Sequence, residues 1–356
     1  MADIFDSLAG LTLNTKEATE DSDLIKVNAY LNPEVSRVHG TQLGIIMDQY
    51  IPILGQFEDI GKLDPGSCGV NTVTDNFPVS EKTWTPKLIS ARIPICADDI
   101  PQKLKFWMEK NIASGRWDNI NDALKQFVLD RASEAQARAI IRISEFADTA
   151  AAVVGSGGYL TAGTTAALFT MLDGMWKQIF IYQATSPTDQ FRYEIAENSE
   201  ASKQAQKTLA EERAYECFSA LTEGLAPEAM SGNNVLMITK TLWDNWVRYL
   251  EKKGGAFKIE LLQDGITKET FRGFPIIVRS DWDRLIKKYH DLGDTYYLPH
   301  RVLLTDINNI PIGTSDTESF SKIEAFYVQK DKTHYTDMAW RQDCKVLQEE
   351  NLAVAY

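Results

Sequence analysis

The sequence predicts an α+β fold built around one long helix that lies across an antiparallel sheet. Three observations lead to this prediction. Apolar residues recur at three- and four-residue spacing over residues 119–152, which is the pattern of one helical face. Turn residues crowd the extended segment 55–98. After residue 234 short apolar runs alternate with helical patterns, and extended runs close the chain.

The helical pattern at residues 119–152 would make a helix on the order of 50 Å long. Its apolar positions are Ile120, Ala123, Leu124, Phe127, Ala135, Ala139, Ile143, Phe146, Ala147 and Ala150. Glu134 stands four residues before Arg138, the favourable order for an ion pair on a helix, and the glycines at 155–158 would end the helix. So long a helix with one apolar face needs a long, flat partner. We therefore expect it to be the spine of an elongated subunit.

Composition limits the class of protein. The 356 residues suffice for one large or two ordinary domains, and 44% are hydrophobic. Acidic residues outnumber basic ones 50 to 37, and the net charge of −13 disfavours a dedicated nucleic-acid binder. The four cysteines (Cys68, Cys96, Cys217 and Cys344) are too scattered for a zinc site or a disulfide framework. With neither a secretory signal nor a membrane-spanning run, we expect a soluble protein made inside the cell.

The first 98 residues are expected to form two extensions. Residues 1–54 read as an N-terminal arm, whose polar, acidic start would be ordered only when it lies on something else. Residues 55–98 read as an extended β-hairpin loop. Because Pro86 and Pro94 cannot donate to a central ladder, its strands should be edges or a projecting arm.

The hairpin loop carries apolar side chains that would have to be buried against another surface. We predict that Trp84, Leu88 and Ile89 contact another subunit, since an isolated hairpin is marginal in water. The alternative is an ordinary edge hairpin on the chain's own sheet. The eight tryptophans and thirteen tyrosines of the chain suit a stable interface and a buried core equally well.

Further elements follow from local pattern. Thr241 with Asp244 resembles a capping box at a helix start. The expected helices are 101–113, 166–180, 203–221, 241–253 and 283–289. The expected strands and extended runs are 235–239, 257–262, 271–282, 300–306, 322–330, 334–341 and 344–355. The three closing runs, 322–330, 334–341 and 344–355, would supply long strands on which the spine helix packs.

No constellation of residues points to catalysis. The glycines at 155–158 follow a helix instead of linking a strand to a helix, so they indicate helix termination and not a phosphate loop. The histidines (His39, His290, His300 and His334) lack the spacing of metal ligands. Asp281, Asp283 and Asp306 fall near strand ends, where helix caps and turns explain them. We predict no catalytic, cofactor-binding or metal-ligating residue, and no cofactor.

Several stretches together carry a family resemblance. They are an N-terminal arm, the extended segment 55–98, the long helix 119–152, the runs NNVLMITKTLWDNW and FRGFPIIVRSDW, and the closing stretch from YLPHRVLLTDINNIPIGTSD to CKVLQEENLAVAY. In this order the chain resembles the major capsid protein of tailed bacteriophages, the Hong Kong 97 type of shell subunit.

The resemblance implies an assignment of parts. Residues 99–158 with 322–356 would form a peripheral domain that contains the spine helix, and residues 159–321 a mixed α/β axial domain around five- and six-fold axes. Some relatives crosslink through a Lys, an Asn and a Glu. Lys82 and Lys87 cannot be matched to those positions, so no crosslink is assigned.

The resemblance also implies a structural function and no enzyme activity. Copies would assemble as pentamers and hexamers into an icosahedral shell that holds double-stranded DNA by weak, non-specific contact. The implied partners are a portal and, as in many relatives, scaffold or decoration proteins, with no membrane. The protein would be found in the virion after assembly in the host cytoplasm. The alternatives are an encapsulin-like compartment shell and a two-domain α/β enzyme with its site near Asp281 and His300.

Overall fold

The structure is a computed structural model of the chain that describes residues 37–54, 79–96, 106, 109–110, 120–230, 233–253, 266–315, 324–328 and 333–356. Its α-helices are α5 (Ile120–Phe146), α6 (Met175–Thr185), α7 (Lys203–Lys207), α8 (Arg213–Gly224), α9 (Lys240–Lys252) and α10 (Ser280–Tyr289). Its strands are β1 (Thr41–Leu43), β2 (Tyr50–Leu54), β3 (Val79–Thr83), β4 (Lys87–Cys96), β5 (Phe191–Tyr193), β6 (Asn234–Ile238), β7 (Ile266–Phe271), β8 (Phe274–Val278), β9 (Val302–Asp306), β10 (Ile312–Thr314), β11 (Glu324–Val328), β12 (Thr333–Cys344) and β13 (Ala353–Ala355). Short 3-10 helices are η2 (Val154–Ser156), η3 (Ala166–Leu168), η4 (Ala196–Ser199), η5 (Pro227–Ala229) and η6 (Ile307–Asn309).

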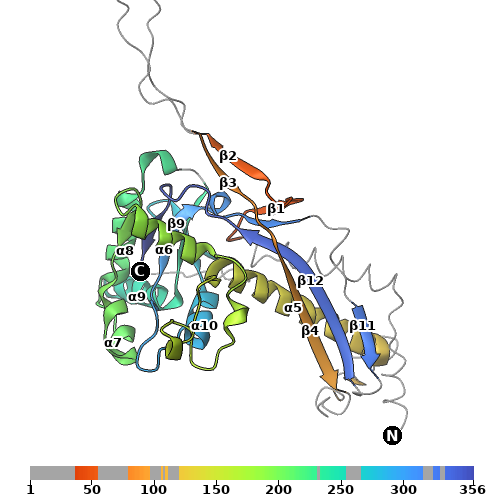
Figure 1. Cartoon of the computed structure of the whole chain (residues 1–356). Helices are drawn as coiled ribbons and strands as arrows, with labels where there is room; N and C mark the ends of the chain where they lie inside the picture. The colour runs from red at the N-terminus through yellow and green to blue at the C-terminus, as the bar shows by residue number, and fades with distance from the viewer. Residues whose placement is uncertain are drawn as a thin grey trace, which may run out of the picture.

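A five-stranded sheet supports the long helix α5, and Figure 1 shows the two extending together to one side of the molecule. In this sheet β12 pairs antiparallel with β4, β11 and β10, and β10 pairs parallel with β1. Ile140 and Ile143 of α5 pack on Ile89 of β4 and Trp340 of β12. The predicted spine helix on an antiparallel sheet is therefore confirmed.

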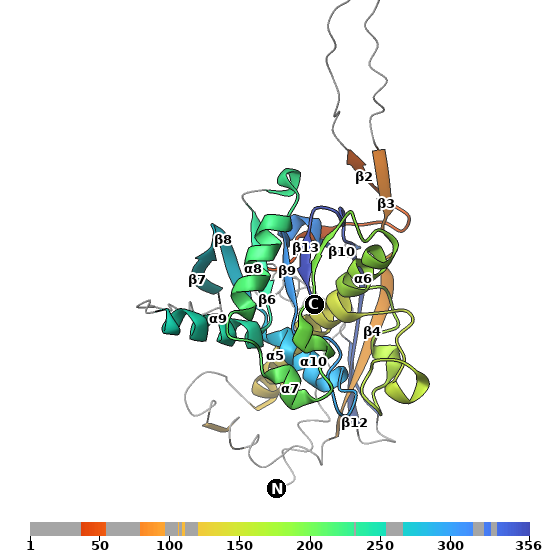
Figure 2. The same cartoon turned by 90° about the vertical axis from the view of Figure 1, so that its left-hand side faces the viewer.

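A six-stranded sheet forms the core of the rounder part of the molecule, with strand order β5-β13-β9-β6-β8-β7. Every residue of β6 is buried, because its side chains alternate between two apolar clusters. Leu236 and Ile238 face the cluster that includes α8 and α9, whereas Val235 and Met237 face the cluster that includes α6 and α10. Figure 2 shows these helices around the strands. Burial on both faces explains the uninterrupted apolar run at β6.

A β-hairpin is present, but its first strand, β2, lies in the predicted arm 1–54 and not in the predicted loop 55–98. β2 pairs antiparallel with β3 from Tyr50–Thr83 to Leu54–Val79, while residues 55–78 lie outside the described residues. After β3 the chain enters β4, which pairs with β12 alone among the described strands. Pro94 thus lies on an edge strand, as its missing N–H requires.

The long helix ends earlier than its pattern predicts, at Phe146 and not at residue 152. Two carboxylates accept hydrogen bonds from the backbone N–H groups that follow the helix. Asp148 accepts from the N–H of Ala150 (2.8 Å), and Asp173 accepts from the N–H of Thr149 (2.9 Å). The helix therefore stops where side chains offer the backbone other partners, ahead of the glycines.

Two further local expectations are wrong. In the extended run at 344–355, Cys344 ends β12 and the next strand is β13, which belongs to the six-stranded sheet with β5 and β9 and not to the sheet under α5. The capping box of α9 does not form either. Thr239 is the N-cap residue, and Asp283 of α10 accepts a hydrogen bond from the N–H of Lys240 at 2.7 Å.

Some sequence expectations fall outside the described residues, namely the arm over 1–36, most of the helix at 101–113 and the strand at 257–262. Within the described ranges, no helix is both long enough and apolar enough to cross a bilayer.

Candidate functional site

The three predicted intersubunit contacts have different surroundings. Trp84 is fully buried within its own chain, and a Cβ added to Gly313 would lie 2.8 Å from its ring. Ile89 is 5% exposed and packs against α5. These two side chains are already covered, which corrects the expectation that a neighbour covers them. Leu88 is 56% exposed, and its contact with another subunit stays a prediction.

An exposed apolar surface lies next to the hairpin base, on β1, the start of β2 and the turn between them. It is formed by Leu43 (59% exposed), Ile46 (71%), Met47 (51%) and Tyr50 (62%). The turn is held rigidly, because the backbone of Gln49 and Asp48 is hydrogen-bonded to that of Trp84 at 2.9 Å on both sides. Four large apolar side chains in eight residues form a patch of the kind found at protein interfaces.

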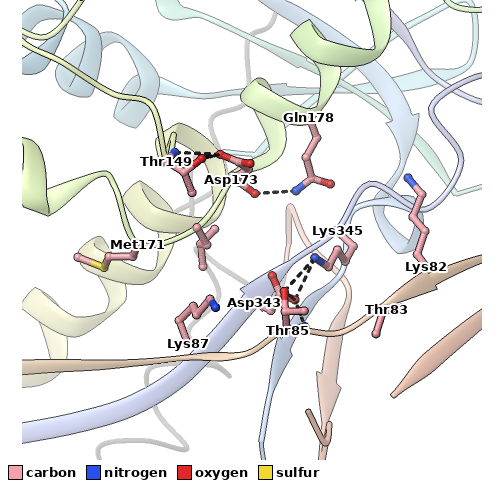
Figure 3. A pocket seen from close by; sticks show the side chains of 11 residues that line it. Lys82, Thr83, Thr85, Lys87, Thr149, Met171, Asp173, Gln178, Asp343 and Lys345 are labelled. Atoms are coloured by element: carbon pink, nitrogen blue, oxygen red, sulfur yellow. Dashed lines mark hydrogen bonds and ion pairs between the residues drawn. The ribbon is translucent and has the colours of Figure 1, made fainter. Parts of the chain in front are cut away.

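A cavity of 390 Å³ lies between the hairpin base and the start of α6 (Figure 3). Asp343 accepts hydrogen bonds there from the N–H of Thr85 (2.7 Å) and pairs with Lys345 (3.2 Å). On the same face, Lys82 pairs with Glu349. The hydrogen bond from Thr85 to Asp343 and the ion pair between Lys82 and Glu349 thus bind the hairpin base to the chain's C-terminal segment. Two further lining residues are also hydrogen-bonded to each other, since the hydroxyl of Thr149 donates to Asp173 at 2.9 Å.

A buried polar network joins the end of α5 to the six-stranded sheet. Glu145, which is 0% exposed, accepts from Trp282 Nε1 at 2.7 Å, lies 2.9 Å from His39 Nε2 and pairs with Arg279 at 2.6 Å. Burial alone would lower the pKa of Arg279, but the carboxylates of Asp281 and Glu145 raise it above its ordinary value. These groups satisfy one another, so removing one of them would leave a buried charge or donor unpaired at the junction between the two sheets.

The enzyme alternative places a site near Asp281 and His300, but each side chain is already engaged elsewhere. Asp281 pairs with Arg279 at 2.5 Å. The two ring nitrogens of His300 lie 2.8 Å from Thr241 Oγ1 and 2.7 Å from the carbonyl oxygen of Gln206. Burial lowers the pKa of His300. No group of three potential metal ligands occurs among the described residues.

Asp283 is the one carboxylate near His300 whose pKa is strongly displaced. Burial raises its pKa to about 6 from 3.8, although the N–H of Lys240 acts in the opposite direction. The folded protein therefore holds a proton on Asp283 at a pH where the unfolded chain has lost it. Rising pH then favours unfolding between about pH 4 and pH 6, because the unfolded state binds fewer protons.

We expect Asp283→Asn to remove this pH dependence while keeping an oxygen that can cap α9. Between pH 4 and pH 6, the free energy of unfolding of the wild type should fall by about 3 kcal/mol relative to that of the variant. The reason is that the pKa values of Asp283 in the folded and unfolded states differ by about two units. Urea unfolding of both proteins at several pH values between 4 and 7 measures the difference. Stability curves that run parallel over this range would contradict the assignment.

Sequence comparison finds no relative, since no protein-family model matches the chain and no curated protein matches it. Structure comparison does find similar folds. A chain of the satellite phage P4 procapsid including the size determination (Sid) protein is 12% identical, with a TM-score of 0.51, and the match covers 96% of this chain and 95% of that chain. A chain of Mycobacterium phage Ogopogo is 12% identical, with a TM-score of 0.50 and 90% of each chain covered. At these identities the likeness is one of fold.

Proposed function

We propose that this chain, which has the α+β fold of phage major capsid proteins, is the major capsid protein of a tailed bacteriophage. Many copies would assemble as pentamers and hexamers into an icosahedral head shell around double-stranded DNA. The observation that carries the proposal is the match to a chain of the P4 procapsid over 96% of this chain.

Other features of the described residues support a structural role. Asp283 caps α9 and His300 is hydrogen-bonded within its own chain, and the exposed apolar surface beside the hairpin base suits a contact with another copy. The net charge of −13 suits a shell that holds DNA by weak contact only, because it opposes tight binding of phosphates. The protein would then act in the virion, after assembly in the host cytoplasm with a portal and with scaffold or decoration proteins.

The assignment of parts is also a proposal, with two revisions. The first is that β4, which lies in the predicted loop 55–98, joins the peripheral domain because it pairs with β12. The peripheral domain would hold α5 with β4, β11 and β12, and the axial domain would hold the six-stranded sheet. Because β13 pairs in the six-stranded sheet, we assign it to the axial domain instead of the peripheral domain. The hairpin that begins with β2 and β3 would lie on a neighbouring subunit and contact it through Leu88 and the exposed apolar surface.

Assembly of the purified protein tests this function. We expect light scattering and negative-stain microscopy to show capsomers or large hollow particles, because the exposed apolar surface is covered only in an assembly. A small monomer that persists across salt and protein concentrations would contradict the proposal. Particles that enclose a cargo enzyme from their native host, in place of DNA, would identify an encapsulin-like compartment instead.

A further inference from the structure

Arg301 lies against a cavity of 370 Å³ between the end of α5, α6 and the segment that follows α10. Its side chain is 1% exposed. The guanidinium is surrounded by rings, with its central carbon 5.2 Å from the ring centre of Phe146, 4.9 Å from that of Trp176 and 5.6 Å from that of Phe180. Stacking on aromatic faces stabilises a cation but leaves its charge uncompensated.

Arg301 has no ion-pair partner among the described residues. Its Nε donates to the carbonyl oxygen of Leu298 at 3.0 Å, while its Nη1 is buried without a hydrogen-bond partner. Burial lowers the pKa of Arg301 to about 10, which leaves it a cation at neutral pH. A buried charge without a counterion is costly, so this position favours a bound anion.

Two further polar side chains line the cavity without a partner. Trp176 Nε1 is a buried, unpaired donor, and both ring nitrogens of His290 are buried and unpaired. Burial first, and the charge of Arg301 second, hold the pKa of His290 well below its usual range, so its ring is neutral. A neutral imidazole offers one more N–H. Arg301, Trp176 and His290 thus line the same cavity, and each has an unpaired donor.

The remaining charges of the cavity cancel. Lys177 pairs with Asp148 at 3.1 Å, and Asp148 also accepts from the hydroxyl of Tyr159 at 2.8 Å. Among the lining residues, Arg301 is therefore the one charge without an ion-pair partner, although the charge of Glu145, outside the lining, also favours its charged form. A dianion such as phosphate would bring an excess negative charge close to Asp148, whereas a monoanion would balance Arg301.

We propose that this cavity is a binding site for a monocarboxylate with an aromatic or aliphatic body. The carboxylate would accept hydrogen bonds from Arg301, Trp176 and His290. The apolar body would lie among the rings of Phe146, Tyr159 and Phe180, with the opening beside Ile181, which is 47% exposed. The site is independent of the proposed shell function, since every group that forms it belongs to one chain.

Calorimetric titration of the full-length protein with 3-phenylpropanoate tests the site. We expect saturable binding with one ligand per chain. The uncharged 3-phenylpropanamide has nearly the same shape and should bind at least about tenfold more weakly, because it cannot balance Arg301. Inorganic phosphate and chloride test for a site that accepts any anion, and a short peptide ending in phenylalanine tests whether the carboxylate can belong to a polypeptide.

Arg301→Met should lower the affinity for 3-phenylpropanoate at least about tenfold. Arg192→Met is the matched control, since Arg192 stacks on Tyr356 at 4.5 Å but does not line the cavity, and it should leave binding unchanged. If Arg301→Met fails to fold, the affinities of the wild-type protein for 3-phenylpropanoate and 3-phenylpropanamide still test the proposal. Equal binding of acid and amide, equal binding of phosphate, or no binding of the acid up to about 10 mM would overturn the proposal and leave ordered water as the occupant.

Discussion

Replacing Glu145 by glutamine is expected to destabilise the subunit by about 3 kcal/mol or more, because it removes the central charge of a buried network. Glu145 is 0% exposed and is surrounded by His39, Arg279 and Trp282 at 2.6 to 2.9 Å. The variant leaves the donors in place but takes away the carboxylate that compensates them. Chemical denaturation of the unassembled subunit measures the loss.

Glu134→Gln is the matched control for this prediction, since it makes the same change about three turns earlier in α5. Glu134 forms ion pairs with Arg131 and Arg138, and its side chain is 42% exposed. Exposed pairs of this kind contribute about 0.5 kcal/mol or less, so this variant should unfold almost like the wild type. A similar loss in both variants would show that α5 responds to any change of charge and that the network has no special role.

Replacing Trp84 by alanine is expected to cost the isolated subunit about 3 to 5 kcal/mol, which is the range for removing a large side chain from a packed core. Trp84 is fully buried, and its backbone binds the turn before β2 through hydrogen bonds of 2.9 Å to Gln49 and Asp48. The cavity left by the ring would loosen the base of the hairpin. Thermal unfolding of subunits kept below the concentration of assembly measures the effect.

Leu88→Ala separates folding from assembly in the same segment. Because Leu88 is 56% exposed, we expect its truncation to change subunit stability by less than about 0.5 kcal/mol. If Leu88 contacts a neighbour, the variant should assemble at a higher protein concentration than the wild type. A Trp84→Ala subunit as stable as the wild type would show that the burial of Trp84 does not contribute to folding.

The overall fold could be predicted because its strongest patterns are local. The apolar stripe of α5, the apolar run Val235–Ile238 in β6 and the prolines of the edge segment each depend on residues close together in the sequence. The order of these elements led to the capsid-protein resemblance, and the structural neighbours confirm that fold. The predicted ion pair between Glu134 and Arg138 is also present.

The polar sites could not be predicted in the same way, because their partners are distant in the sequence. His39 and Glu145 are 106 residues apart, and His39 also bonds the carbonyl oxygen of Ile310, 271 residues away. Arg301 has no sequence signal, since its significance is the absence of a counterion in folded surroundings. Trp84 was misassigned for a related reason. A tryptophan in an edge segment has the same local pattern whether its own chain or a neighbour covers it.

The course of the chain after residue 333 has a mechanical consequence. β12 is bound side by side to β4 from Thr333 to Gln342, and the same backbone runs on into β13, between β5 and β9. A pull along β4 would load the whole ladder of hydrogen bonds in shear, all at once, and would then travel through covalent bonds into the second sheet. Under tension the five-stranded and six-stranded sheets would therefore resist together. The hydrogen bonds between strands would break before the covalent connection between β12 and β13.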